Sequence, residues 1–233
     1  MRDFEDIFAE AAARHGGPEA LEAKLATTRP LSADQVAAIP DDRVLSQMAR
    51  HIFQSGFSWA VIDKKWPGFE AAFAGFDPAT NAAMSDERFD ELLKDTGIIR
   101  NGAKIRSVAL NAQLLMRLAA EHGSAAKFFA QWPDEDFAGL LEFLKKNGDR
   151  LGGHAGARVI RELGKPSYIL SDSVVAALVK EGVVANAPTS KRDLAAVQAA
   201  FNAWSSQSGR DLTTISRTLA LSTGDIYGQH SAT

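Results

Sequence analysis

The stretch IRSVALNAQLLMRL, residues 105–118, carries the pattern that decides the fold class. Apolar side chains recur in it every three or four residues, at Ile105, Val108, Ala112, Leu115 and Leu118. This spacing places them on one face of an α-helix, because a helix turns once in about 3.6 residues. The same spacing runs through most of the chain, whereas stretches that alternate apolar and polar residues, as half-buried strands do, are scarce. The sequence therefore predicts an all-α protein.

Helix start signals agree with this prediction. Three segments begin with such signals: Pro18 opens PEALEAKLA, Ser85 precedes DERFDELLKD, and Ser190 with Asp193 resembles a capping box ahead of a further helix. Short turns that contain glycine or proline separate the segments. We therefore expect about a dozen helices of modest length.

Length and composition bound the organisation of the chain. With 233 residues, of which 45% are hydrophobic, the chain can bury its own core as one large domain or as two intimate lobes. It holds no internal repeat and no long linker, so we expect a single all-α domain over residues 1–233. Within it, residues 1–40 form N-terminal helices and residues 225–233 form a tail.

The residue types present exclude several kinds of chemistry. Without a cysteine, the chain cannot form a disulfide, a thiol nucleophile, or a cysteine-ligated zinc or iron–sulfur site. Its five histidines lie too far apart in the sequence to bind one metal from neighbouring helix turns. Neither a glycine-rich nucleotide loop nor the GxSxG motif of hydrolases occurs. We therefore predict no metal site and no cofactor.

Charge and hydropathy bear on location and partners. No run approaches the roughly 20 apolar residues of a membrane-spanning helix, and the first residues include acids where a secretion signal carries bases. We expect a cytoplasmic protein with no membrane association and no obligate protein partner. The net charge of −3 hides a basic stretch, residues 142–165, with six bases against three acids. That stretch is either a phosphate-binding face or a solvated helix surface.

The stretch HIFQSGFSW, residues 51–59, combines polar side chains with an indole. If one helix continues through it, the step of about 100° per residue gathers polar groups at the edge of Trp59, namely His51, Gln54, Ser55 and Ser58. Such a group suits a flat heteroaromatic ligand, which needs a stacking surface and hydrogen bonds along its edge. The alternative is that Trp59 belongs to the core and the polar residues form a solvated strip.

Residues 54–111 contain a series of short motifs. In order, these are Q-x-G-x-S-W, K-K, a phenylalanine pair leading to F-D-P, A-x-M, and D-x-G-I-I-R-x-x-x-K-I. The series covers about a quarter of the chain and resembles the 3-methyladenine DNA glycosylase I family. The resemblance implies a helix-hairpin-helix glycosylase fold. It also implies a DNA repair N-glycosylase that flips an alkylated purine, such as 3-methyladenine, out of damaged double-stranded DNA and hydrolyses its glycosidic bond.

The resemblance assigns a base-binding pocket but no catalytic residue. The family's tryptophan after G-x-S stacks on the damaged base, and Trp59 occupies that position here. We expect His51, Gln54 and Ser58 to line the pocket beside it, and Phe53 to form part of its wall.

A second resemblance concerns DNA binding. Residues 164–170, GKPSYIL, are similar to the turn of helix-hairpin-helix glycosylases, in which backbone N–H groups at a helix N-terminus bind a phosphate. This turn is alternatively an ordinary helix connection. On the first interpretation, DNA is contacted by Gly164, Lys165, Pro166, Ser167 and Tyr168, together with Arg158 of the basic stretch. Tyr168 stands where strand-nicking relatives carry a lysine, which implies a monofunctional enzyme, and we expect Lys165 to be a solvated charge.

Three departures from the family pattern support an alternative. Residues 1–50 lack the Trp, Tyr and Cys from which the family builds pocket aromatics and a zinc site. His51 stands where the family has a base-contacting glutamate, and Asn186 stands near the place of a catalytic aspartate in related enzymes. A neutral imidazole accepts a hydrogen bond but does not neutralise a cationic base. The alternatives are a non-enzymatic relative that binds DNA or another ligand on the same fold, and a helical protein that never contacts DNA.

Overall fold

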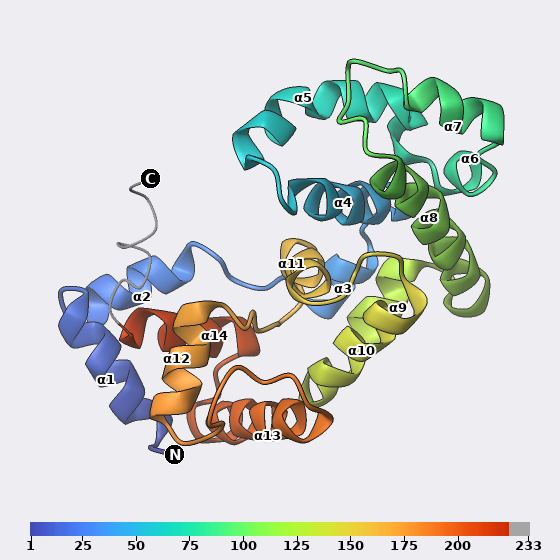
Figure 1. Ribbon diagram of the computed structural model, residues 1–233. Helices are drawn as coiled ribbons and strands as arrows, with labels where there is room; N and C mark the ends of the chain where they lie inside the picture. Colours follow the sequence, from blue (N-terminus) through green and yellow to red (C-terminus); the bar gives the residue numbers. More distant parts are fainter. Residues whose placement is uncertain (224–233) are drawn as a thin grey trace. The chain divides into compact units, whose positions relative to one another are not determined.

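Figure 1 presents the computed structural model of the chain, which describes residues 1–223. Within these residues there are fourteen α-helices, two short 3-10 helices and no strand, and twelve of the α-helices have seven residues or more. The prediction of an all-α protein with about a dozen helices is confirmed. The predicted tail, residues 225–233, lies outside the described residues. No described helix is both long enough and apolar enough to cross a membrane.

The described chain divides into two compact units, each of which is built from separate stretches of sequence. The first unit contains residues 1–31, 133–138 and the described residues from 166 onward, and the second contains residues 32–132 and 139–165. Because the chain enters the first unit three times, no single linker separates the two units in the sequence.

The first unit is organised around its last helix. Its elements are α1 (Phe4–Arg14), α2 (Pro18–Ala26), η2 (Asp134–Asp136), α12 (Asp172–Lys180), α13 (Lys191–Ser208) and α14 (Leu212–Ser222). Helix α14 contacts α1, α2, α12 and α13. Its face is partly polar, and hydroxyls of α14 accept hydrogen bonds from the backbone N–H groups of Ser167 and Ile169. In this way α14 provides hydrogen-bond acceptors for backbone N–H groups of the irregular segment that precedes α12.

The second unit contains the remaining helices. These are α3 (Ala33–Ala37), α4 (Asp41–Gln54), α5 (Trp59–Ala72), η1 (Ala74–Phe76), α6 (Pro78–Ala82), α7 (Asp86–Leu92), α8 (Gly102–His122), α9 (Ala125–Gln131) and α11 (His154–Glu162). Helix α10 (Phe137–Asn147) begins in the first unit and continues in the second. Helix α4 contacts both α8 and α11 (Figure 1). The apolar residues whose spacing predicted a helix over 105–118 all lie on α8 and are at most 4% exposed.

The predicted helix starts are confirmed. Pro18 is the first residue of α2, where its missing N–H costs no hydrogen bond. Ser85 precedes α7, and its side chain accepts a hydrogen bond from the backbone N–H of Arg88 at 3.2 Å. Ser190 precedes α13 and accepts in the same way from Asp193 at 3.1 Å.

A ladder of aromatic rings fixes α5 in the second unit. Trp66 is stacked between Phe69 and Phe76, with ring centroids 5.2 and 5.4 Å away, and Phe73 continues the stack. Phe53, in the last turn of α4, meets the face of Phe69 edge-on at 4.6 Å. Because these rings are large and the four phenylalanines are fully buried, they hold α4 and α5 together.

A carboxylate beside this ladder adds polar links between α4 and α5. Glu70 accepts two hydrogen bonds from the guanidinium of Arg43, one from the hydroxyl of Ser46 and one from the indole N–H of Trp66, all between 3.0 and 3.1 Å. Burial raises the pKa of Glu70, but these hydrogen bonds lower it more, so that the pKa lies below its usual value. The charged carboxylate therefore stabilises the orientation of α5.

We predict that Gly68→Ala destabilises the protein although the residue lies inside α5. Helix propensity alone favours alanine over glycine by about 1 kcal/mol. A Cβ at Gly68 would lie 2.6 Å from the carbonyl oxygen of Gly97, and backbone atoms cannot move aside cheaply. We therefore expect the free energy of unfolding in urea to fall by about 1–3 kcal/mol.

The matched control is the exposed position Lys64, also inside α5. There, Lys64→Ala should be more stable than Lys64→Gly by about 1 kcal/mol. A Gly68→Ala protein that is more stable than the wild type would contradict the close approach of the two glycine backbones.

Candidate functional site

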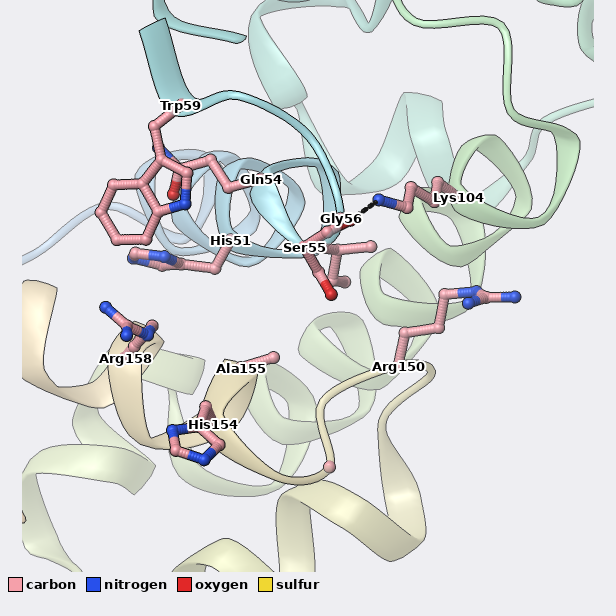
Figure 2. Close-up of a pocket in the computed structure, with 12 residues that line it drawn as sticks. His51, Gln54, Ser55, Gly56, Trp59, Lys104, Arg150, His154, Ala155 and Arg158 are labelled. Carbon is pink, nitrogen blue, oxygen red and sulfur yellow. Dashed lines mark hydrogen bonds between the residues drawn. The ribbon is translucent and has the colours of Figure 1, made fainter. Parts of the chain in front are cut away.

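The second unit contains a cavity of about 600 Å³ between the C-terminal end of α4 and the N-terminal end of α11. Figure 2 shows the side chains that surround it. Its lining residues are His51, Ile52, Gln54, Ser55, Gly56, Trp59, Lys104, Arg150, Gly152, His154, Ala155 and Arg158. The volume is within the range of sites that bind small molecules or single nucleobases.

The expected single helix through residues 51–59 is wrong. Helix α4 ends at Gln54, and α5 begins at Trp59. Between them Gly56 has a φ of +76°, a left-handed conformation that glycine adopts without steric cost, and Ser55 and Ser58 are extended. His51 and Trp59 are therefore brought together by the bend between two helices and not by the periodicity of one.

Lys104 fixes this bend. Its ammonium group donates hydrogen bonds to the backbone carbonyls of Phe53 and Ser55, which the end of α4 leaves without helical partners. The same group lies 4.7 Å from the centre of the Phe57 ring. Burial and the nearby charge of Arg150 lower the pKa of Lys104. A cation at a helix C-terminus also interacts favourably with the helix dipole.

Two polar side chains of α4 face the cavity with atoms that lack hydrogen-bond partners. His51 and Gln54 are 6% and 5% exposed. The amide nitrogen of Gln54 donates to Asp63 at 3.5 Å, whereas the Gln54 side-chain oxygen and both ring nitrogens of His51 have no partner within hydrogen-bonding geometry among residues 1–223. Leaving such groups unsatisfied costs roughly 1–3 kcal/mol each, so a ligand that pairs with them gains that amount.

His51 is uncharged at neutral pH. Burial, and after it the positive charges of Arg158 and Arg50, lower the pKa of its imidazole to about 4, although the nearby side chain of Gln54 opposes this effect. The neutral ring has one nitrogen that accepts a hydrogen bond and one that donates. Together with the oxygen of Gln54, it offers a pattern of hydrogen bonds that suits the edge of a heteroaromatic ring.

Trp59 provides an aromatic surface beside these groups. It is 48% exposed, and its ring centre lies 6.4 Å from that of His51, with the two planes at 70°. The guanidinium carbon of Arg158 lies 5.0 Å from the centre of the indole. Figure 2 shows Trp59 and His51 on one side of the cavity and Arg158 and His154 on the opposite side, on α11.

Only some of the expected pocket residues line the cavity. His51, Gln54 and Trp59 line the cavity. Phe53 is fully buried against Phe69, and Ser58 is an exposed residue immediately before α5, so neither is among the lining residues. Arg158, which the sequence placed on a phosphate-binding face, is part of the cavity wall.

The residues expected to contact DNA at the hairpin are mostly buried. The expectation that Lys165 is a solvated charge is wrong: it is 4% exposed, and its ammonium donates to the carbonyl of Trp132 at 2.7 Å. Gly164, just before it, has a φ of +84°. The chain re-enters the first unit at Pro166, which lines a second cavity of about 520 Å³.

The next two hairpin residues belong to the core of the first unit. Ser167 is fully buried, and its N–H donates to the hydroxyl of Thr213. Tyr168 is 1% exposed, stacks on Phe201 at 4.4 Å, and donates its hydroxyl hydrogen to Gln198. Burial raises the pKa of the Tyr168 phenol, which therefore stays protonated.

Sequence reasoning did not place Lys104, Arg150 or His154 in the base-binding site. Lys104 belongs to the motif D-x-G-I-I-R-x-x-x-K-I, so a signal for it was present. Arg150 belongs to the basic stretch, residues 142–165, so a weaker signal was present for it, whereas no motif marks His154 at the start of α11. Among residues 1–223, no group of three histidine, aspartate or glutamate side chains could hold a metal ion.

The fold and the cavity define an all-α protein with a basic site beside an exposed indole. Comparison with known proteins is consistent with this. Residues 36–139 match the sequence model of the methyladenine glycosylase family. The chain is similar to that family over less than half of its length.

Individual relatives show how partial the similarity is. DNA-3-methyladenine glycosylase 1 of Escherichia coli (strain K12) is 38% identical over 65 residues, and DNA-3-methyladenine glycosylase of Haemophilus influenzae is 32% identical over 65 residues. In both cases the match covers 28% of this chain and 35% of the relative. A solved structure of 3-methyladenine DNA glycosylase I from Staphylococcus aureus has 22% identity and a TM-score of 0.48, over 59% of this chain and 78% of that one.

We predict that His51 makes folding stability depend on pH. An unfolded histidine has a pKa of about 6.5, whereas that of His51 is about 4 in the folded protein. Between these values the unfolded state binds the extra proton, so stability is full above about pH 7 and falls as the pH decreases toward 4. Relative to His51→Gln, the wild type should lose up to about 3 kcal/mol of unfolding free energy over this range.

The measurement is urea unfolding at a series of pH values. His122→Gln, which removes a histidine whose side chain is 37% exposed, is the matched control. If the wild type and His51→Gln lose stability in parallel from pH 7 to 4, His51 is not held in its neutral form by burial.

Proposed function

We propose that the protein is a DNA repair N-glycosylase that flips an alkylated purine into the cavity beside Trp59 and hydrolyses its glycosidic bond. One observation carries the proposal: the unpaired nitrogens of His51 and the unpaired oxygen of Gln54 lie in the same cavity as an exposed indole. A purine has a flat face for the indole and polar atoms along its edge for the other two residues. The similarity of residues 36–139 to the methyladenine glycosylase family supports the same reaction class.

The cationic residues around the cavity suit a nucleic-acid substrate. Lys104, Arg150 and Arg158 line it. A base that has been flipped out of a duplex brings its phosphodiester to the mouth of the site, where positive charge is favourable. We propose that the substrate is damaged double-stranded DNA and that the protein acts in the cytoplasm. We assign no catalytic side chain.

The cavity accounts for binding and selection in this reaction. Extrusion of the nucleotide breaks its stacking within the duplex, and Trp59 replaces part of that stacking. Gln54 accepts a hydrogen bond from an N–H of the base, and neutral His51 accepts or donates another. A water molecule then attacks the sugar carbon, and the reaction leaves an abasic site.

The alternative function is a binding protein on the same fold. The observation that favours it is the buried state of the hairpin, where the N–H groups of Ser167 and Ile169 are already bonded to hydroxyls of α14. These two N–H groups are therefore already used in the fold and do not offer a hydrogen bond to a phosphate. A relative that binds DNA or another heteroaromatic ligand without cleaving it would have the same cavity.

The test is release of free bases from duplex DNA that carries both cationic methylated purines and neutral alkylated purines, separated by chromatography. We expect the wild type to release alkylated purine, and Trp59→Ala to lower the rate roughly 5- to 150-fold, because stacking of a base on an aromatic ring contributes about 1–3 kcal/mol. Val61→Ala, at another exposed apolar position of α5, should leave the rate unchanged.

Two results would argue against the proposal. Binding of this DNA without release of either kind of base would favour the non-enzymatic alternative. A Trp59→Ala protein that releases bases at the wild-type rate would remove Trp59 from the site, provided that its circular dichroism shows the helices intact.

We predict that base removal is not followed by strand cleavage through a Schiff base. That reaction needs an accessible amine, whereas Lys165 is buried and bonded to the Trp132 carbonyl, and Tyr168 carries a phenol. Incubation with DNA that contains an abasic site, followed by borohydride, should give no covalent protein–DNA adduct. An adduct that disappears in Lys165→Ala would show that this lysine reaches the sugar.

A further inference from the structure

Arg158 occupies a position that the proposed function leaves unexplained. It lies on α11, half-buried, with its guanidinium carbon 5.0 Å from the centre of the Trp59 indole. Among residues 1–223 no carboxylate forms an ion pair with it. A positive charge on the ring surface is attracted by the π electrons of the indole, so the arrangement is favourable without any anion.

The rest of the cavity does not compensate this charge. Its lining includes Lys104 and Arg150 as well as Arg158, and it includes no aspartate or glutamate. Two carboxylates lie close by but outside the lining. Asp63 pairs with Arg50 at 2.7 Å, and Asp149 lies 3.9 Å from the guanidinium of Arg150.

This charge distribution acts on a ligand that stacks at Trp59. A base that carries a positive charge would be repelled by Arg158 at short range, where partial exclusion of water strengthens the repulsion. An uncharged base avoids this repulsion and still pairs its N–H groups with Gln54 and His51.

We propose that Arg158 is a specificity-determining residue, and that the cavity selects uncharged purine bases with an N–H donor and rejects purines that carry a positive charge. The inference rests on the proposed function in that it concerns the same base-binding site. It names a narrower class of substrate: lesions such as N-alkylated or ring-extended purines that remain neutral in DNA, in place of cationic methylated purines.

The test uses two isomeric nucleosides and the full chain. In 1-methyl-2′-deoxyadenosine the base is protonated and positively charged at neutral pH, whereas in N6-methyl-2′-deoxyadenosine it is uncharged. We expect tryptophan fluorescence titration to give at least about tenfold tighter binding of the neutral isomer, the ratio that corresponds to 1.4 kcal/mol. Arg158→Gln should bring the two affinities closer together by about that factor.

The comparison between variants separates charge from shape. The two isomers place their methyl groups differently, but this difference is the same for the wild type and for Arg158→Gln. Arg117→Gln, which removes a positive charge at an exposed position of α8, is the control and should keep the wild-type ratio. A ratio that is equally large in Arg158→Gln would overturn the role of Arg158.

The remaining outcomes are also decisive. Equal or tighter binding of the charged isomer by the wild type, or binding of neither isomer, would overturn the inference. Because base release from DNA is not measured in this experiment, the two proposals can fail separately. Preference for the neutral isomer in a protein that releases no base would retain the selectivity and refute the glycosylase activity.

Discussion

The contact on which the site depends is the hydrogen bonding of Lys104 to the carbonyls of Phe53 and Ser55. A helix leaves its last carbonyls without partners, and a buried ammonium from α8 satisfies two of them. The end of α4 is therefore fixed at Gln54, and the chain turns at Gly56 before α5 begins at Trp59. The aromatic ladder and Glu70 then hold α5, so that the indole faces His51.

The chemistry of the cavity follows from the absence of a carboxylate in its lining combined with several cations. Burial and the charge of Arg158 keep His51 neutral, and the amide oxygen of Gln54 is an acceptor without a donor. The groups of α4 that face the cavity are therefore uncharged and the surrounding charges are positive, which is the basis of the proposed preference for an uncharged base.

The hairpin illustrates a limit of motif-based interpretation. The letters GKPSYIL resemble a phosphate-binding turn, yet Ser167 and Tyr168 lie in the core of the first unit, and Lys165 is buried in the second. A motif of this kind specifies a backbone conformation, and Gly164 does adopt a positive φ. It does not specify whether the N–H groups stay free, because Thr213 and Ser216, which bond to them, lie more than forty residues further along the chain.

The sequence by itself determined the helical class and the helix starts at Pro18, Ser85 and Ser190, because helical periodicity and capping depend on residues only a few positions apart. Its short motifs also indicated the similarity of the central segment to the methyladenine glycosylase family. It also placed His51, Gln54 and Trp59 near one another, although it assumed one helix where there are two. Only the tertiary structure decided that Phe53 belongs to the core and that Lys104, Arg150 and Arg158 surround the cavity. Burial, pKa and charge compensation depend on groups from α4, α8 and α11, which are distant in the sequence and meet only when the second unit has folded.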